Sequence, residues 1–134
     1  MKTNLMSYYF SKTLERTSIE AAYERVANAL KTEGFGILTE IDVAKTFKKK
    51  LDVDFKKYLI LGACNPHFAY KAITAEDKIG VFLPCNVIIT ETSTGNVEVA
   101  AVDPIASMMS VKNENLGALA TEVQKKMQKV MELL

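Results

Sequence analysis

Hydrophobic residues recur along this 134-residue chain with two spacings, and the spacing separates predicted strands from predicted helices. Alternating or short continuous apolar runs rich in aromatic and β-branched residues predict strands. A Ser-Thr-Gly-Asn turn at residues 93–96 predicts that the last two strands form an antiparallel pair. The predicted strands cover residues 5–14, 35–41, 58–63, 79–83 continuing after a break as 87–91, and 97–102.

Apolar residues at every third or fourth position predict helices between these strands. Thr17 is expected to begin the first helix, because Glu20 stands at capping-box spacing from it. Gly34 is a natural stop for that helix. Asp42 is expected to cap a second, shorter helix that runs to about residue 50.

Two further helices have clear start signals. Asn65 is a good N-cap and Pro66 suits the first helical position, so a third helix is predicted to run to about residue 75. Asn113 or Asn115 is expected to cap a long last helix with a continuous apolar stripe. A short helical piece is expected before it.

The predicted order of elements is β-α-β-α-β-α-β-β-α. Helices that cross between strands, followed by a hairpin, favour the α+β class with two layers. The expected sheet is mixed, largely antiparallel and packed by helices. Pro84 has no backbone N–H, so it marks an edge, a bulge or a break in the fourth strand. The length predicts one domain over residues 1–134.

Composition excludes several classes of protein. The formal net charge is +1, which gives no global field that attracts nucleic acid or an anionic membrane, so neither is an expected partner. The longest apolar stretch, residues 79–89, is too short to cross a membrane. Two cysteines are too few for a secreted disulfide scaffold. The cytoplasm is therefore the expected compartment, with both thiols reduced.

The first candidate site lies at Cys64, Asn65 and Pro66, where a buried strand meets a helix N-terminus. The partial positive charge of a helix N-terminus favours a thiolate and attracts small anions. Tyr70, with His67 and Lys71 nearby in the sequence, would be able to line such a site. The alternative is that Cys64 is a small core residue and Asn65 only a cap, and this reading is favoured because free cysteine is usually buried.

The second candidate is the pair Cys85 and Asn86, which follows Pro84. A side-chain amide inside an apolar stretch has two possible roles. It forms hydrogen bonds with backbone groups at a break in the sheet, or it projects into a cleft, and the first role is the more common. The two Cys-Asn pairs would converge if their strands are neighbours. A single histidine and two cysteines without ligand spacing predict no metal site, and no cofactor follows from the sequence.

Four ordered blocks of the sequence together resemble the family catalogued as domain of unknown function 302, over most of the chain from about Ala21 onward. The resemblance implies a compact α/β domain that pairs as a homodimer, and it assigns no activity. Asp103 belongs to the matched positions that invite a site, together with the two Cys-Asn pairs. The blocks are residues 36–43 (GILTEIDV), 61–66 (LGACNP), 79–87 (IGVFLPCNV) and 101–104 (AVDP).

Three functions are compatible with these patterns. The favoured one is a homodimeric module that binds a small ligand, an anion among the candidates, near Cys64, Asn65, Pro66, Cys85 and Asn86. The second is a thiol-dependent enzyme or redox sensor that uses Cys64, so the sequence leaves open whether the protein is an enzyme. The third is a structural or interaction protein that acts through its dimer or its last helix.

Overall fold

The structure, a computed structural model, describes residues 7–93 and 95–134, without the side chain of residue 93. It confirms the α+β class, with a five-stranded sheet and helices packed on it. Residues 5 and 6 of the first predicted strand and residue 94 of the predicted turn lie outside the described residues. The elements are β1 Tyr9–Leu14, α1 Ile19–Thr32, β2 Gly36–Asp42, α2 Val43–Leu51, β3 Tyr58–Cys64, α3 Pro66–Ala75, the 3-10 helix η1 Asp77–Phe82, β4 Cys85–Ser93, β5 Asn96–Val102, α4 Pro104–Ser107 and α5 Glu114–Glu132.

The strand order is β1-β5-β4-β3-β2, and all four described pairings are antiparallel. The expected sheet was mixed and largely antiparallel, and no parallel pairing occurs among the described strands. The reason is that α2 and α3 each connect neighbouring strands of opposite direction, whereas α1 crosses from β1 at one edge of the sheet to β2 at the other, which runs the same way as β1 but does not pair with it. In the β3–β4 pair, Ala63 stands opposite Cys85, so the two Cys-Asn pairs meet at one end of the sheet.

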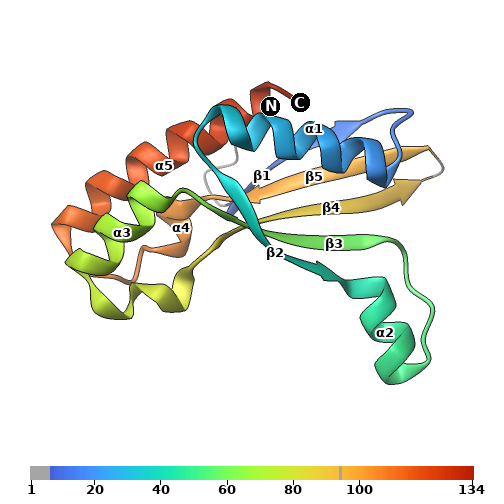
Figure 1. The fold of residues 1–134 in the computed structure, drawn as a ribbon, viewed down its shortest axis with the longest axis horizontal. Helices are drawn as coiled ribbons and strands as arrows, with labels where there is room; N and C mark the ends of the chain where they lie inside the picture. The colour runs from blue at the N-terminus through green and yellow to red at the C-terminus, as the bar shows by residue number, and fades with distance from the viewer. Residues whose placement is uncertain (1–6, 94) are drawn as a thin grey trace.

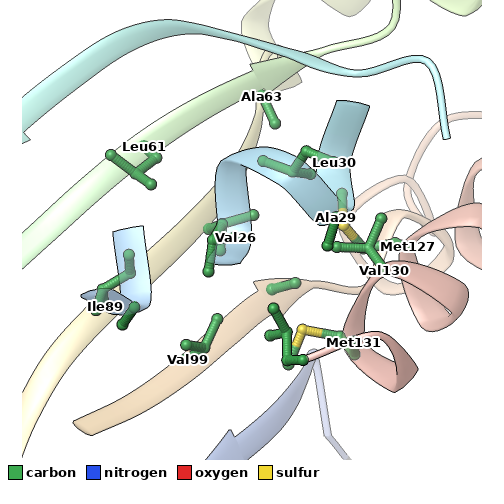
Figure 2. Close-up of a cluster of buried hydrophobic side chains, with 14 of the residues drawn as sticks. Val26, Ala29, Leu30, Leu61, Ala63, Ile89, Val99, Met127, Val130 and Met131 are labelled. Atoms are coloured by element: carbon green, nitrogen blue, oxygen red, sulfur yellow. The ribbon is translucent and has the colours of Figure 1, made fainter. Parts of the chain in front are cut away.

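One face of the sheet packs against α1 and α5, which run across it (Figure 1). Alternate residues of the strands point into this layer, as the period of two requires. Figure 2 shows Val26 and Leu30 of α1 facing Leu61 of β3, with Met127 and Met131 of α5 closing the core. All five of these side chains are buried. The apolar stripe predicted for the last helix is therefore largely a core stripe.

The second helix lies apart from this core. Figure 1 shows α2 projecting beyond the ends of β2 and β3, away from α1 and α5. Asp42 caps it as predicted, accepting a hydrogen bond from the backbone N–H of Lys45 at 3.0 Å. No residue of α2 is buried.

The predicted strand at residues 79–83 is wrong. The backbone N–H of Ile79 donates to Glu76 and that of Leu83 donates to Gly80, which is the three-residue bonding of a 3-10 turn. Within this segment Ile79 is buried, while Val81 and Phe82 are exposed. Pro84 cannot join a ladder, and β4 starts directly after it.

The first helix begins one residue later than predicted. Ser18 is its N-cap, and the Ser18 hydroxyl accepts a hydrogen bond from the backbone N–H of Ala21 at 3.1 Å. The Thr17 hydroxyl instead donates to the carbonyl of Glu15. Thr and Ser are both favoured N-cap residues, so the sequence does not distinguish Thr17 from Ser18. The path of the backbone decides which of the two caps the helix.

Candidate functional site

A cavity of about 340 Å³ lies where the ends of β3 and β4 meet α3, η1 and α5. Its volume falls within the range of about 300–1,000 Å³ that is usual for small-molecule pockets. Leu38 and Ile73 are exposed, so the cavity reaches the surface beside them. Its walls are mainly apolar, and they comprise Phe35, Leu38, Ala63, Cys64, Asn65, Phe68, Ala69, Ala72, Ile73, Gly80, Leu83, Pro84, Cys85, Pro104, Met108, Leu116, Leu119, Ala120 and Val123.

Asn65 supplies the one side-chain amide among the described residues of this lining. It occupies the N-cap position of α3, but its side chain makes no capping hydrogen bond, so the prediction that it caps the helix through its side chain is wrong. Its Nδ2 donates instead to the carbonyl of Glu33 in the α1–β2 turn, at 3.3 Å. Gly34 leaves room for this approach, because a Cβ there would lie 3.0 Å from Nδ2.

The other amide atom, Asn65 Oδ1, has no hydrogen-bond partner among the described residues. Asn65 is only 8% exposed, so water reaches this acceptor poorly. Exchanging the two amide atoms would set Oδ1 against the Glu33 carbonyl, which is repulsive, so the contact with Glu33 fixes the orientation. A buried acceptor without a donor costs about 1–3 kcal/mol.

Both cysteines line the cavity, and neither forms a disulfide. Burial raises the pKa of the Cys85 thiol to about 11, and the nearby Cys64 adds to this shift. Cys85 is therefore protonated at neutral pH and is a weak nucleophile there. The convergence that the two Cys-Asn pairs suggested does bring the thiols to one cavity.

Four other predicted site residues lie elsewhere. Three of them are exposed and do not line this cavity, namely Pro66, Tyr70 and Asn86. Asn86 therefore does not project into the cavity, and it is not buried, although its apolar neighbours in the sequence suggested burial. Tyr70 is 75% exposed. Asp103 caps α4 through a 3.0 Å bond from the N–H of Ile105, and Gln124 of α5 donates to both of its oxygens.

Most residues of the cavity wall are not predicted from the sequence. Leu116, Leu119, Ala120 and Val123 belong to the predicted stripe of the last helix, and their period gives no sign that part of the stripe faces a cavity. The signal for the cavity in the sequence is Pro84, because β4 begins directly after this proline and the cavity lies beside that end of the strand.

The described residues contain neither a candidate metal site nor a candidate membrane span. No group of three or more His, Cys, Asp or Glu side chains within them is arranged to hold a metal ion. None of the helices in the described ranges combines the length and the apolar character that a membrane crossing requires.

Comparison with known proteins places the chain in context. The sequence model of the family described as domain of unknown function DUF302 matches residues 10–134. A crystal structure of an uncharacterized conserved protein DUF302 from Bacillus stearothermophilus has the same fold, with a TM-score of 0.84 at 24% identity, covering 94% of this chain and 97% of that one. No curated protein matches the chain.

Proposed function

Since the chain belongs to the family described as domain of unknown function DUF302, which assigns no activity, we propose a function from its cavity: the protein is a module that binds a small, largely apolar, uncharged ligand. The single observation that carries this proposal is the unpartnered Oδ1 of Asn65 in an otherwise apolar lining. A ligand with an O–H or N–H group would supply the missing donor. The cytoplasm, where the thiols stay reduced, is the proposed compartment.

The lining also indicates the charge and size of the ligand. No lysine, arginine or histidine is among the described residues of the cavity wall, so an anion would find only the helix N-terminus. An uncharged ligand is therefore favoured over the anion that the sequence suggested. A cavity of about 150 Å³ holds one benzene molecule, so the volume here suits a ligand of about twice that size.

The test uses two probes that differ in one hydrogen-bond donor, indole and 1-methylindole. Chemical shifts of the backbone amides, followed during titration, locate binding and give the affinities. We expect both compounds to shift residues of the cavity wall, and indole to bind about threefold to tenfold more tightly through its N–H. Asn65→Leu should abolish this preference while 1-methylindole still binds. Tyr70→Ala, outside the cavity wall, is the control and should change neither affinity.

The outcomes separate the parts of the proposal. Absence of shifts at the cavity wall with either indole would overturn ligand binding there. Equal affinities in the unsubstituted protein would remove the role of Oδ1. Tighter binding of benzoate than of indole would restore the anion and refute an uncharged ligand. Native mass spectrometry of the protein purified from cells under reducing conditions then identifies the natural ligand by its added mass.

A thiol-dependent activity of Cys64 is the second candidate, because Cys64 lines the cavity in which a ligand would bind. His67 is exposed and is not part of the wall, so no imidazole base within it serves Cys64. The rate at which Cys64 is alkylated in the native protein at neutral pH tests this activity. A rate well above that of a cysteine in a free peptide supports a thiol-dependent activity, and an equal or lower rate contradicts it.

The proposed module is a homodimer, as the resemblance to the family implied. An interaction role through the dimer alone is the remaining alternative. It would be favoured if no probe entered the cavity while the protein still self-associated.

A further inference from the structure

The face of the sheet opposite α1 and α5 carries a continuous apolar row. Strand residues alternate between the two faces, so those next to the core residues point to this open face. The registers place Ile41 opposite Ile60, Ile60 opposite Ile88, and Ile88 opposite Ala100. The row therefore crosses four neighbouring strands, and none of the described helices packs over it.

The row continues onto the segment that we call the arm, residues 42–57, which consists of α2 and the loop after it. The bend between arm and sheet is concave and apolar, and Ile41 and Ile60 belong to both surfaces. Leu51, Val53 and Phe55 are exposed apolar residues of the arm. The remaining residues at the bend are Val43, Thr46, Phe47, Phe55 and Tyr58.

The arm helix is short and only partly packed within the chain. Isolated helices of fewer than about 12–15 residues are marginal in water, and most helical stability in proteins comes from burying one face. The helix α2 has nine residues and buries none of them within the chain. Val43, Ala44 and Phe47 are half-buried, and the ring of Phe47 lies 5.2 Å from that of Phe55, but Leu51 at the end of the helix stays exposed. A further apolar cover would therefore stabilise the arm.

We propose that two copies of this chain associate through these surfaces, with the arm of each copy packing on the open sheet face of the other. The inference rests on the proposed homodimer and names the surfaces that form it. A two-fold axis makes one patch meet the same patch on the partner. Both surfaces in need of cover lie on the same chain, and this arrangement covers both at once.

The available area fits a protein partner of this kind. Five strands spaced about 4.8 Å apart, each about 20 Å long, present a flat area of about 500 Å². The nine-residue helix of the arm adds about 130 Å² of projected area, from a length of about 13 Å and a width of about 10 Å. Accessible area exceeds flat area, so sheet and arm together approach the roughly 800 Å² per partner of a standard interface, whereas the sheet alone falls well short.

Charge also favours a second copy over an unrelated partner. The arm has six lysines and three aspartates, a net charge of +3, so the rest of the chain carries −2 in a total of +1. Only Lys48 among the arm lysines forms an ion pair with a described residue, to Asp52 and Asp54. Glu98, on the open face by the alternation of β5, is half-buried and forms no ion pair with the described residues. A partner's arm would bring lysines to it.

Sedimentation velocity tests the proposal on the full chain and two variants. We expect the unsubstituted protein at tens of micromolar to sediment at twice the 14.9 kDa chain mass. Leu51→Glu charges a side chain that is 65% exposed within the chain, so folding should persist while the dimer dissociates. Ile88→Glu tests the centre of the open face. Val81→Glu, at a residue 81% exposed outside both surfaces, is the control and should remain dimeric.

Each result supports or refutes a defined part of the proposed dimer. Loss of the dimer in Leu51→Glu and Ile88→Glu but not in the control supports the interface, provided that circular dichroism shows a folded chain. An unsubstituted protein that is monomeric overturns both the dimer and its surfaces and leaves the cavity proposal intact. A dimer that survives both substitutions overturns these surfaces alone.

Discussion

Asn65 and Cys85 show how single side chains acquire a chemical character that their sequence neighbours do not specify. The amide of Asn65 turns from the helix that it precedes toward the carbonyl of Glu33, and this leaves the buried Oδ1 without a partner in a residue that lines an apolar cavity. The thiol of Cys85 stands beside that of Cys64 because of the pairing of β3 with β4. Gly62, two positions before Cys64, is constrained by Thr39, its partner in β2, and by Pro84 just before β4.

Gly62→Ala should destabilise the fold. A Cβ on Gly62 would overlap Thr39 Oγ1 and lie 2.6 Å from Pro84 Cγ, so we expect the free energy of unfolding in urea to fall by about 2 kcal/mol. Gly36→Ala is the matched control in a neighbouring strand. A Cβ at Gly36 meets nothing within 4 Å, and its effect should stay within about 0.5 kcal/mol.

Adding Thr39→Ala to Gly62→Ala removes one of the two overlapping groups and should restore part of the lost stability. Equal losses for Gly62→Ala and Gly36→Ala would mean that the close approach to Thr39 and Pro84 does not constrain the strand.

Cys85 should make stability depend on pH in the alkaline range. Its pKa is about 11 in the folded protein against an ordinary value of 9.0, so the folded state holds the proton more tightly than the unfolded chain does. That contribution is present below pH 9 and is lost as the pH rises through 11, a loss of about 2 kcal/mol. Urea unfolding at pH 8 and pH 11 should show this loss, and Cys85→Ala should lack it. An identical loss in the variant would assign the effect to other groups.

At the scale of elements, the start and the type of a segment were predictable where one local signal dominated. Asp42 caps α2 as expected, and Asn113 rather than Asn115 caps α5. The segment at residues 79–83 was mistaken for a strand, because a short apolar run has the same composition in a strand and in a 3-10 turn. The segment packs through Ile79, which is buried against Leu116 of α5, and through the partly buried Leu83.

The cap of α1 offers a comparison between neighbours. Ser18→Ala removes the acceptor for the N–H of Ala21 and should lower the free energy of unfolding by about 1 kcal/mol. Thr17→Ala, which the sequence alone would make the damaging change, removes only a bond to Glu15 and should cost less. Urea unfolding of both variants distinguishes them, and a larger loss for Thr17→Ala would contradict the observed cap.

At the scale of the whole molecule, one sheet face forms the core with α1 and α5, while the other face and the arm carry the surfaces that the proposed dimer would cover. The cavity lies at the opposite end of the sheet from the arm (Figure 1). Binding of a small ligand and association of two copies would therefore use separate surfaces.

A dimer of this kind should unfold at a temperature that depends on concentration. A twentyfold rise in protein concentration is expected to raise Tm by about 3 °C, because unfolding releases two chains from one folded unit. Leu51→Glu should have a Tm that does not change with concentration. Scanning calorimetry at about 5 and 100 µM would show whether the unsubstituted protein follows the first behaviour or the second.

The sequence by itself determined the fold class, the family and most helices and strands, because each depends on the period of apolar residues and on capping residues within a few positions. It also marked Cys64, Asn65 and Cys85, which do meet at one cavity. Only the tertiary structure decided where the Asn65 side chain turns, which part of the α5 stripe lines the cavity, and that one sheet face stays open. These features depend on contacts between residues far apart in the chain, and a local period reports that a side chain is buried without specifying its neighbours.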